Sequence, residues 1–391
     1  MTRSLLILGA GPLQVPAIRK AKDMSLRVGV VDINPGAVGI PIADAYFPVS
    51  STDEAGVVAA ARDFAADGVL TLATDMPMRA AAKVCEELSL PGISYDVAVK
   101  ATDKIEMVRV FEREGVAHPW YRIIPQDLDL EPLANSLTYP CICKPADSSG
   151  SRGVMQVDDA RGLRDAVNYG RAQSRSGRCI VEELLVGYEV SVEVLVSGYD
   201  PQIITVTDKL TTGSPHFVET GHTQPSGLSA RDLGLVTMLA AQAVRAIGVS
   251  NGAAHVEIMV TREGPKIIEL GARLGGDYIT SHLVPLSTGV DMVGACIRLA
   301  LGETSVVRQT MRKGSAIRYF SAPLGKLRCV GGLDRARAIP GVVEVAFSRQ
   351  VGEYVGDIAN SSDRVGHVIA QAQTSGAAVE ACRRAIDLIR F

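Results

Sequence analysis

The first hundred residues alternate between short apolar segments that suit β-strands and longer amphipathic segments that suit helices. Strands that are separated by helices are joined by crossover connections, so this alternation predicts a parallel sheet covered by helices. The predicted strands are residues 5–8, 27–32, 45–48 and 68–73; one predicted helix ends at residue 22, and two more span residues 54–66 and 80–88.

A second feature is the segment of residues 139–154, where a strand-like stretch ends and Lys144 is followed by a loop rich in serine and glycine. Small residues let backbone N–H groups approach an anion closely, and Lys144 and Arg152 add positive charge. The segment therefore predicts a site for nucleotide phosphates, although an ordinary glycine turn would have a similar composition. The loop residues are Ser148, Ser149, Gly150, Ser151, Arg152 and Gly153.

A hairpin is predicted where residues 255–260 alternate as a strand and residues 266–270 return after a turn near Glu263. Folding about that turn places Glu257 opposite Glu269, with their Cβ atoms about 5 Å apart on one face of the sheet. Two such carboxylates repel each other, and a bridging divalent cation with a preference for oxygen ligands, Mg²⁺, removes the repulsion. The alternatives are a solvated sheet face, or a carboxylate paired with Arg273 or Lys266.

The residues after this hairpin combine an arginine with paired glycines. Arg273 follows Glu269 by four residues, and Gly275, Gly276 and Asp277 come next. A guanidinium beside metal-binding carboxylates can stabilise a transferring phosphoryl group or an acyl phosphate. A structural Arg–Glu pair is the alternative role for Arg273. Asp277 is a candidate partner for the ammonium of an amine substrate.

Residues 211–229 contain glycine, proline and serine and are long enough to form a functional loop. Within this segment Glu219 precedes His222 by three residues and can orient it. A surface or structural histidine is the alternative to a catalytic one.

Residues 180–189 form a strand that ends, bends at Gly187 and resumes. The backbone N–H and C=O groups left unpaired at such a break can bind the edge of an adenine ring. A plain connection between two strands would have the same appearance. The residues concerned are Glu182, Glu183, Leu184, Leu185 and Glu189.

Taken in order, these motifs resemble the ATP-grasp superfamily over essentially the whole chain. The segment Lys-Pro-x-Asp-Ser-Ser-Gly-Ser-Arg-Gly-Val at residues 144–154 is most similar to the L-amino-acid ligase (dipeptide-forming) branch of the carboxylate–amine ligases. Residues 217–226 and 271–277 resemble the same branch. One position departs from the common Glu-x-Asn-x-Arg pattern, because Gly271 stands where many members have the metal-binding Asn. Gly271 is either a mark of the subfamily or a sign of a weakened second metal site.

The resemblance implies a role for each matched residue. Lys104, at a Thr-Asp-Lys helix start, and Lys144 would contact the α- and β-phosphates, and the loop of residues 148–153 would close over the triphosphate. Glu182 and the backbone of Glu183, Leu184 and Leu185 would bind adenine, and Glu189 would bind the ribose. Glu257 and Glu269 would hold two Mg²⁺ ions, for which Mn²⁺ can substitute; Arg273 would face the acyl phosphate, and His222 would lie over the acceptor pocket, which Glu219, Gly275, Gly276 and Asp277 would help to line.

The implied fold is a mixed α/β and α+β architecture in three parts. Residues 1–100 would form a Rossmann-like domain that precedes the ATP-grasp region, and residues 101–302 the nucleotide-binding region, with a lid at about 138–186. Residues 303–391 would form a C-terminal subdomain. Within these parts the sequence predicts a helix over 101–114 capped by Thr102 or Asp103, a helix over 230–247 and a last helix over 376–389.

The implied reaction is an ATP-dependent ligation that joins a carboxylate to an amine through an acyl phosphate, with at least one amino-acid substrate. An ATP-grasp carboxylase or formyltransferase of purine-type metabolism, and a non-catalytic ATP-binding protein, are the alternatives. A dinucleotide-binding oxidoreductase is a weaker interpretation: Gly9 and Gly11 precede Asp32 at about the right distance, but Gln14 stands in place of the third glycine.

Charge and cysteine content limit the partners. The formal net charge is −3, without a strongly basic segment, which argues against nucleic acid as the main partner. No apolar run approaches the roughly 20 residues that span a bilayer, and the seven cysteines lack metal-site spacing. We therefore expect a cytoplasmic protein with reduced thiols, small-molecule substrates, no membrane partner and a homodimeric state.

Overall fold

In the computed structural model, which describes residues 2–126 and 128–391, the N-terminal part is a four-stranded parallel sheet with the strand order β3-β2-β1-β4. This confirms the parallel sheet that the strand–helix alternation predicts. Its strands are β1 (Ser4–Leu8), β2 (Arg27–Val31), β3 (Ala45–Phe47) and β4 (Gly68–Leu70). Its helices are α1 (Val15–Asp23), η1 (Ile40–Ile42), α2 (Glu54–Asp63) and α3 (Met78–Leu88).

The glycine turn after β1 is filled by the protein's own side chains. The Gln14 amide donates a hydrogen bond to the carbonyl oxygen of Leu72 at 2.7 Å, and a Cβ on Gly9 would lie 3.2 Å from the Gln14 side chain. The Asp32 carboxylate accepts a hydrogen bond from the backbone N–H of Ala10 at 2.8 Å. Both polar groups are therefore engaged in holding the turn, which leaves no support for the dinucleotide interpretation.

Two helices, α4 (Tyr95–Thr102) and α5 (Lys104–Arg113), meet at Asp103. The Asp103 carboxylate accepts hydrogen bonds from the backbone N–H groups of Ile105 and Glu106, so it caps α5 as predicted. The predicted start at residue 101 was wrong, because residues 101 and 102 belong to α4. The extended backbone of Asp103 separates the two helices and places Lys104 in the first turn of α5.

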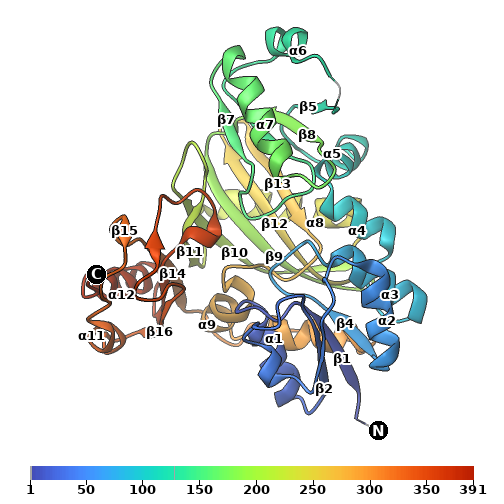
Figure 1. The fold of residues 1–391 in the computed structure, drawn as a ribbon, viewed down its shortest axis with the longest axis vertical. Helices are drawn as coiled ribbons and strands as arrows, with labels where there is room; N and C mark the ends of the chain where they lie inside the picture. Colours follow the sequence, from blue (N-terminus) through green and yellow to red (C-terminus); the bar gives the residue numbers. More distant parts are fainter. Residues whose placement is uncertain (1, 127) are drawn as a thin grey trace.

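A small antiparallel sheet with the order β5-β8-β6-β7 forms the top of the molecule in Figure 1, where it stands apart from the N-terminal sheet. Its core is closed by α7 against apolar residues of β6 and β8. The elements are β5 (Tyr121–Ile124), α6 (Leu130–Ser136), β6 (Cys141–Pro145), β7 (Met155–Val157), η2 (Ala160–Gly162), α7 (Leu163–Gln173) and β8 (Cys179–Glu183).

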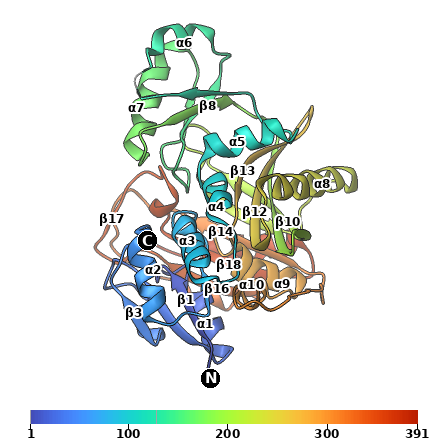
Figure 2. The same cartoon turned by 90° about the vertical axis from the view of Figure 1, so that its right-hand side faces the viewer.

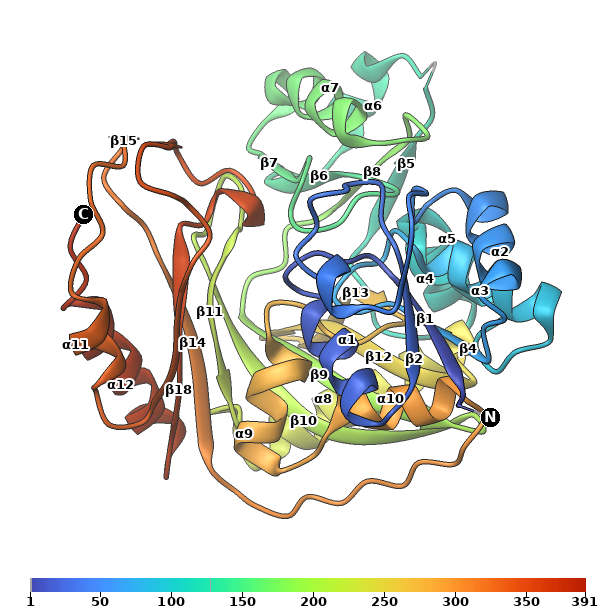
Figure 3. The same ribbon diagram turned by 60° about the horizontal axis from the view of Figure 1, so that its bottom comes forward.

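An eight-stranded antiparallel sheet, with the order β13-β12-β9-β10-β11-β14-β18-β16, connects the remaining parts. It runs from the centre of the molecule into the C-terminal lobe, as Figure 3 shows, so the region before residue 302 and the region after it share one sheet. The strands are β9 (Tyr188–Ser197), β10 (Asp200–Thr211), β11 (Glu219–Gln224), β12 (Asn251–Thr261), β13 (Gly264–Gly271), β14 (Gly314–Phe320), β16 (Val342–Phe347) and β18 (Gly366–Ala372).

The two faces of this sheet have opposite chemistry, because successive side chains of a strand point to opposite sides. On β9, Val190, Val192, Val194 and Val196 pack into a core with α8 (Ala230–Ile247), whose bounds match the predicted helix. Burial of each valine contributes about 2 kcal/mol. Toward the start of β9 the intervening residues Glu189, Ser191 and Glu193, with polar residues of the neighbouring strands, form a polar face that carries the candidate site. Farther along the same face Leu195 packs into the core beside the N-terminal sheet.

The remaining elements surround the ends of this sheet, and Figure 2 shows α9 and α10 beneath it and the C-terminal strands behind them. The sequence did not predict the segment after β13: η3, a π-helix (Ile279–Leu283), α9 (Val284–Thr288) and α10 (Met292–Ala300). The C-terminal elements are β15 (Gly325–Lys326), α11 (Leu333–Arg337), β17 (Tyr354–Val355), η4 (Ser361–Asp363) and α12 (Ser375–Ile386), which is the predicted last helix with a shorter end.

No single helix in the part of the chain that the structure describes is both long and apolar enough to cross a membrane. The segments Ile279–Thr288 and Met292–Ala300 reach that length and apolarity only together, across a bend of 120°. Many of their side chains are buried in the core beside the N-terminal sheet.

Candidate active site

Lys209 lies at the centre of the polar face and interacts with three glutamates. Its Nζ is 2.7 Å from Glu189 Oε1, 2.9 Å from Glu257 Oε2 and 3.9 Å from Glu219 Oε1. Burial favours the neutral amine, but Glu189, Glu257 and Glu219 together hold the pKa of Lys209 well above its usual value. Lys209 was not among the predicted site residues, although its place opposite Glu189 follows from the pairing of β10 with β9.

Glu257 and Glu269 are direct partners in the ladder of β12 and β13, as predicted. Glu269 Oε1 accepts a hydrogen bond from Lys104 Nζ at 2.8 Å, and Glu257 Oε1 lies 3.3 Å from His255 Nε2. Although burial opposes ionisation, Lys209 and His255 hold the pKa of Glu257 well below its usual range. The two carboxylates thus share one face, and each already has a cationic neighbour.

The alternative partners considered for these carboxylates are engaged elsewhere. Lys266 Nζ is 3.0 Å from Glu183 Oε2. The Arg273 guanidinium binds Asp75 through two hydrogen bonds, Nε to Oδ1 at 2.9 Å and Nη2 to Oδ2 at 3.0 Å.

Lys104 and Lys144 are both buried and converge on one pocket of about 170 Å³. Lys144 Nζ is 2.6 Å from Glu182 Oε2, and Lys104 Nζ also donates to the carbonyl oxygen of Ser148 at 2.7 Å. Burial lowers the pKa of Lys104, but the adjacent Glu269 raises it further, so that it lies above its usual value. The rest of the wall combines apolar side chains with the residues predicted to bind adenine and ribose: Ile142, Glu183, Leu184, Leu185, Glu189, Met259 and Ile268.

The serine–glycine loop contains three residues in the left-handed conformation, with φ of 66° at Gly150, 58° at Ser151 and 79° at Gly153. A Cβ on Gly153 would lie 2.9 Å from the Cβ of Gln173, so this position needs glycine for both its conformation and its space. Ser151 Oγ donates to the carbonyl oxygen of Phe217 at 3.4 Å. The loop therefore bridges the small sheet and the large one.

The side chain of Arg152 lies on a different side of this loop from the pocket of Lys104 and Lys144. Together with Ser149, it lines a second, larger cavity, and its Nε donates to the carbonyl oxygen of Ser149 at 2.9 Å. In this structure Arg152 is therefore not beside the two buried lysines.

The larger cavity has a volume of about 510 Å³ and lies between the N-terminal sheet, the serine–glycine loop and the C-terminal strands. Gly150, Lys209, Glu219 and Glu257 line both this cavity and the pocket of the two lysines. Arg273 and Asp75 lie on its wall. Burial by itself would lower the pKa of the Arg273 guanidinium, but the adjacent Asp75 carboxylate keeps that pKa above its usual value.

The surroundings of residue 271 explain why this position is glycine and not asparagine. A Cβ at this position would lie 2.5 Å from Asp75 Oδ1 and 3.1 Å from the Arg273 guanidinium carbon. The Asp75–Arg273 pair therefore occupies the space that an Asn side chain would need, which favours interpreting Gly271 as a subfamily feature.

The functional loop predicted around His222 is wrong at this residue, because His222 lies in strand β11, where it pairs with Lys209 on one side and with Ile317 on the other. It is 1 % exposed, and its Nε2 lies 3.2 Å from Asp277 Oδ2. Burial lowers the pKa of His222 more than Asp277 raises it.

The predicted role of Asp277 also needs correction. Its two carboxylate oxygens accept hydrogen bonds from the Arg364 guanidinium, both at 2.7 Å, and one of them also contacts His222. Burial by itself would raise the pKa of Asp277, but the Arg364 guanidinium has the larger effect and holds that pKa well below its usual range. Asp277 is thus already neutralised and is not available as the principal partner of a substrate ammonium.

Glu219 is the better candidate for that partner. A bulge in β11 omits residue 220 from the ladder, which turns Glu219 to the same face as His222. Its Oε2 is buried without a hydrogen-bond partner among the described residues. Burial, opposed by Lys209, raises the pKa of Glu219 to about 7.

The two glycines that precede Asp277 permit close packing. A Cβ on Gly275 would lie 2.6 Å from Glu193 Oε2, and a Cβ on Gly276 would lie 3.3 Å from the carbonyl oxygen of Ala73. Gly276 lines the larger cavity. Gly275 instead allows the chain to cross the buried Glu193–His255 pair, whose nearest atoms are 2.7 Å apart.

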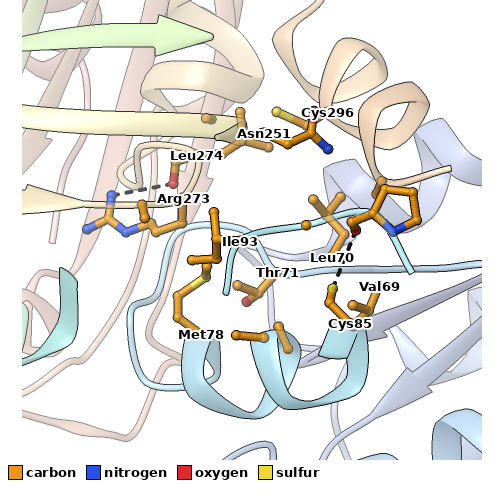
Figure 4. A pocket seen from close by; sticks show the side chains of 18 residues that line it. Val69, Leu70, Thr71, Met78, Cys85, Ile93, Asn251, Arg273, Leu274 and Cys296 are labelled. Atoms are coloured by element: carbon orange, nitrogen blue, oxygen red, sulfur yellow. Dashed lines mark hydrogen bonds between the residues drawn. The ribbon is translucent and has the colours of Figure 1, made fainter. Parts of the chain in front are cut away.

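A third cavity, shown in Figure 4, is small and mostly apolar, with a volume of about 70 Å³. It lies behind Arg273, between α3 and α10, and its wall includes Leu70, Met78, Ile93 and Cys296. The Arg273 side chain points away from it, and Nη1 donates to the carbonyl oxygen of Leu274 at 3.4 Å. This cavity is a packing gap between the N-terminal sheet and the eight-stranded sheet.

Comparison with known families accounts for this arrangement. Residues 137–281 match a family model described as the ATP-grasp domain, and residues 318–391 match one described as L-amino acid ligase C-terminal domain 2. The chain belongs to the ATP-grasp family. The first matched range contains both glutamates of the opposed pair and Arg273, and the second contains most of the C-terminal strands.

This ATP-grasp protein is also similar to individual proteins over most of its length. It is 30 % identical over 344 residues to the uncharacterized protein y4rH of Sinorhizobium fredii, covering 87 % of this chain and 68 % of that one. It is 24 % identical over 331 residues to human carnosine synthase 1, covering 77 % of this chain but only 40 % of that enzyme. The crystal structure of the L-amino acid ligase from Bacillus licheniformis has the same fold, with a TM-score of 0.86, 20 % identity and coverage of 99 % and 98 %.

Proposed function

We propose that this protein is an ATP-dependent carboxylate–amine ligase that forms an amide or peptide bond and releases ADP and phosphate. The observation that carries the proposal is the junction of two cavities at Gly150, Lys209, Glu219 and Glu257. A nucleotide in the pocket of the two lysines would direct its terminal phosphate toward an acceptor in the larger cavity. The L-amino acid ligase domain at residues 318–391 supports at least one amino-acid substrate.

In the first step, a substrate carboxylate oxygen attacks the γ-phosphorus, the bond to the β-phosphate bridging oxygen breaks, and ADP leaves. Lys104 and Lys144 would neutralise charge on the phosphates, and the loop of residues 148–153 would exclude water from the acyl phosphate. In the second step, a neutral amine attacks the acyl carbon, the bond from that carbon to the phosphate oxygen breaks, and phosphate leaves with the proton that the nitrogen loses. Arg273 would stabilise the negative charge of the acyl phosphate and of the tetrahedral intermediate.

The opposed carboxylates fit divalent cations. Glu257 and Glu269 provide hard oxygen ligands on one face, next to the lysine pocket. We propose that they hold two Mg²⁺ ions, for which Mn²⁺ can substitute, and that the ions supply charge neutralisation for the triphosphate. The described residues contain no cluster of three or more His, Cys, Asp or Glu side chains suited to a metal, so phosphate oxygens and water would complete the coordination.

We further propose that the substrates are a small-molecule carboxylate and amine, that the protein is cytoplasmic and that it forms a homodimer. All seven cysteines are free thiols, which agrees with a reducing compartment. A carboxylase or formyltransferase of purine-type metabolism has less support, because the C-terminal domain matches the L-amino acid ligases.

Phosphate release from Mg·ATP across an array of amino acids, supplied singly and in pairs, tests the proposed function. Mass spectrometry of each reaction would identify a dehydrated adduct of the two substrates. Phosphate that appears only with a pair, together with such an adduct, is the expected result. Tight ATP binding with no pair-dependent product would contradict the proposal and favour a non-catalytic role.

Ionisation of Glu219 is expected to make kcat/KM for the amine substrate depend on pH. As its pKa is about 7, its anionic form, which can bind an ammonium and take a proton from it, increases as the pH rises through 7. We therefore expect kcat/KM for the amine to rise about tenfold from pH 6 to pH 8, with no such rise in the Glu219→Gln variant. A rise of the same size and midpoint in Glu219→Gln would assign the titration to another group.

A further inference from the structure

One end of the larger cavity has a wall of three aromatic side chains that the proposed reaction does not use. Tyr319 on β14 and His367 on β18 are direct partners in the ladder, and their ring centroids are 5.9 Å apart. Tyr278, in the turn after β13, lies with its ring centroid 4.6 Å from that of His367. Three separate elements therefore contribute to one continuous aromatic wall.

The backbone at Tyr278 is held in a costly conformation. Asp277 and Tyr278 have φ values of 52° and 60°, in the left-handed region that bulky residues rarely adopt. Each such residue costs about 1–2 kcal/mol. Asp277 is fixed by Arg364 and His222, and this turn aims the Tyr278 ring at His367. Strained residues of this kind concentrate at functional sites, and glycine or asparagine would fit the turn at lower cost.

The charges around the wall are already balanced. Arg364 pairs with Asp277 and lies 3.7 Å from the centroid of the Tyr319 ring. His367 Nε2 is 3.0 Å from Glu344 Oε1 on the side away from the cavity. The charged groups beside the wall are therefore already paired with one another, and none of these four is free to pair with an ionised substrate side chain there, which favours a neutral side chain.

One polar atom in the wall still lacks a partner. Tyr319 Oη is buried without a hydrogen bond to any described residue, and a hydrocarbon side chain packed there would leave it unpaired at a cost of about 1–3 kcal/mol. An aromatic side chain with a hydrogen-bonding atom would satisfy it after a small movement. The same ring could pack edge-on or offset against Tyr278 and His367 at the 4.5–7 Å separation that aromatic pairs prefer.

We propose that Tyr278, Tyr319 and His367 form a side-chain subsite that selects an amino-acid substrate with a neutral aromatic ring bearing a polar atom. Phenol, indole and imidazole side chains belong to this class. The inference rests on the proposed ligase function and names the side-chain class of an amino-acid substrate.

The first test compares kcat/KM for tyrosine, phenylalanine, leucine and alanine, each with the same partner substrate. In the wild-type protein we expect tyrosine to exceed both phenylalanine and leucine by at least about tenfold. Tyr319→Phe keeps the ring but removes the hydroxyl, so it should bring the tyrosine-to-phenylalanine ratio to within about threefold of unity. A tyrosine-to-phenylalanine ratio of kcat/KM that Tyr319→Phe leaves unchanged would show that the Tyr319 hydroxyl does not select the polar ring, which would overturn that part of the proposal.

The second test removes a ring without adding backbone strain. Tyr278→Asn suits the left-handed turn and should lower kcat/KM for tyrosine by about tenfold or more, while alanine changes by less than about twofold. Tyr199→Asn is the matched control, because Tyr199 also has a positive φ, 67°, but is 68 % exposed and far from the cavity wall. An equal loss for every substrate in Tyr278→Asn would indicate a structural role and overturn the subsite.

Failure of this inference is distinguishable from failure of the proposed function. Efficient ligation of leucine or alanine in preference to every aromatic amino acid would overturn the subsite and leave the ligase function intact. If no amide forms with any pair, the ligase function fails, and the subsite is judged by binding alone. In that case tyrosine should raise the melting temperature of the wild-type protein but not of Tyr278→Asn, and no rise in the wild-type protein would overturn the subsite.

Discussion

Glu269→Gln is expected to lower ATP-dependent product formation by at least about 10³-fold while the protein remains folded. The substitution preserves the size of the side chain and an acceptor for Lys104, which lies 2.8 Å from Glu269 Oε1. It removes the negative charge that a divalent cation needs, and a loss of about 4 kcal/mol in transition-state stabilisation corresponds to a 10³-fold change in rate. Phosphate release and product mass spectrometry measure the effect.

A control on the same hairpin separates this effect from a general loss of charge. Glu263 lies in the turn between β12 and β13, with 79 % of its side chain exposed, so Glu263→Gln should retain nearly all activity. Binding of Mn²⁺, followed by its electron paramagnetic resonance signal with ATP present, gives a readout that is independent of turnover. Turnover and Mn²⁺ binding like those of the wild-type protein in Glu269→Gln would rule out the metal assignment.

The parts of the site that the sequence predicts are those fixed by local geometry. The predicted hairpin brings β12 and β13 together, but the register of its turn alone would set Glu257 opposite Ile268; a bulge that skips Ile268 makes Glu257 and Glu269 direct partners. The Asp103 cap is local in the same way, because its side chain reaches only the next turn of backbone. The strand–helix alternation of the N-terminal part favours a parallel sheet, because each helix carries the chain back to the end of the sheet at which the previous strand began.

The parts that the sequence did not predict depend on contacts between distant segments. Asp75 and Arg273 are 198 positions apart, and Asp277 and Arg364 are 87 apart, so neither pair has a signature in local spacing. Their formation depends on how the N-terminal sheet and the C-terminal strands pack against the turn after β13. The same is true of His222, whose strand is recognisable only because β10 and β14 lie on either side of it.

Lys209 is intermediate between these cases. Simple alternation along β9 and β10 places it on the face of Glu189. The additional approach of Glu219 needs the bulge at residue 220, which no short-range pattern in the chain indicates. The sequence therefore predicts the polar face but not which cation neutralises it.

Arg273→Met is expected to reduce ligation by about 10³-fold and to change the KM for ATP by less than about threefold. The fork of Arg273 uses Nε and Nη2 for Asp75 and one weaker bond from Nη1 for Leu274. A guanidinium has five N–H donors, so two remain for the acyl phosphate. Removing such donors typically costs about 10²–10³-fold in rate, and the lysine pocket that would hold the nucleotide is lined by other residues.

A stability effect must be separated from this catalytic one, because Arg273→Met leaves the buried Asp75 carboxylate without its partner. Asp75→Asn is the informative comparison: it retains the guanidinium and loosens its position, so it should lose much less activity, while its melting temperature falls by a similar amount. Arg273→Lys keeps the charge without the planar fork and should recover only part of the rate. If Asp75→Asn lost as much ligation as Arg273→Met, the arginine would act by holding the fold together and not by contacting the reacting atoms.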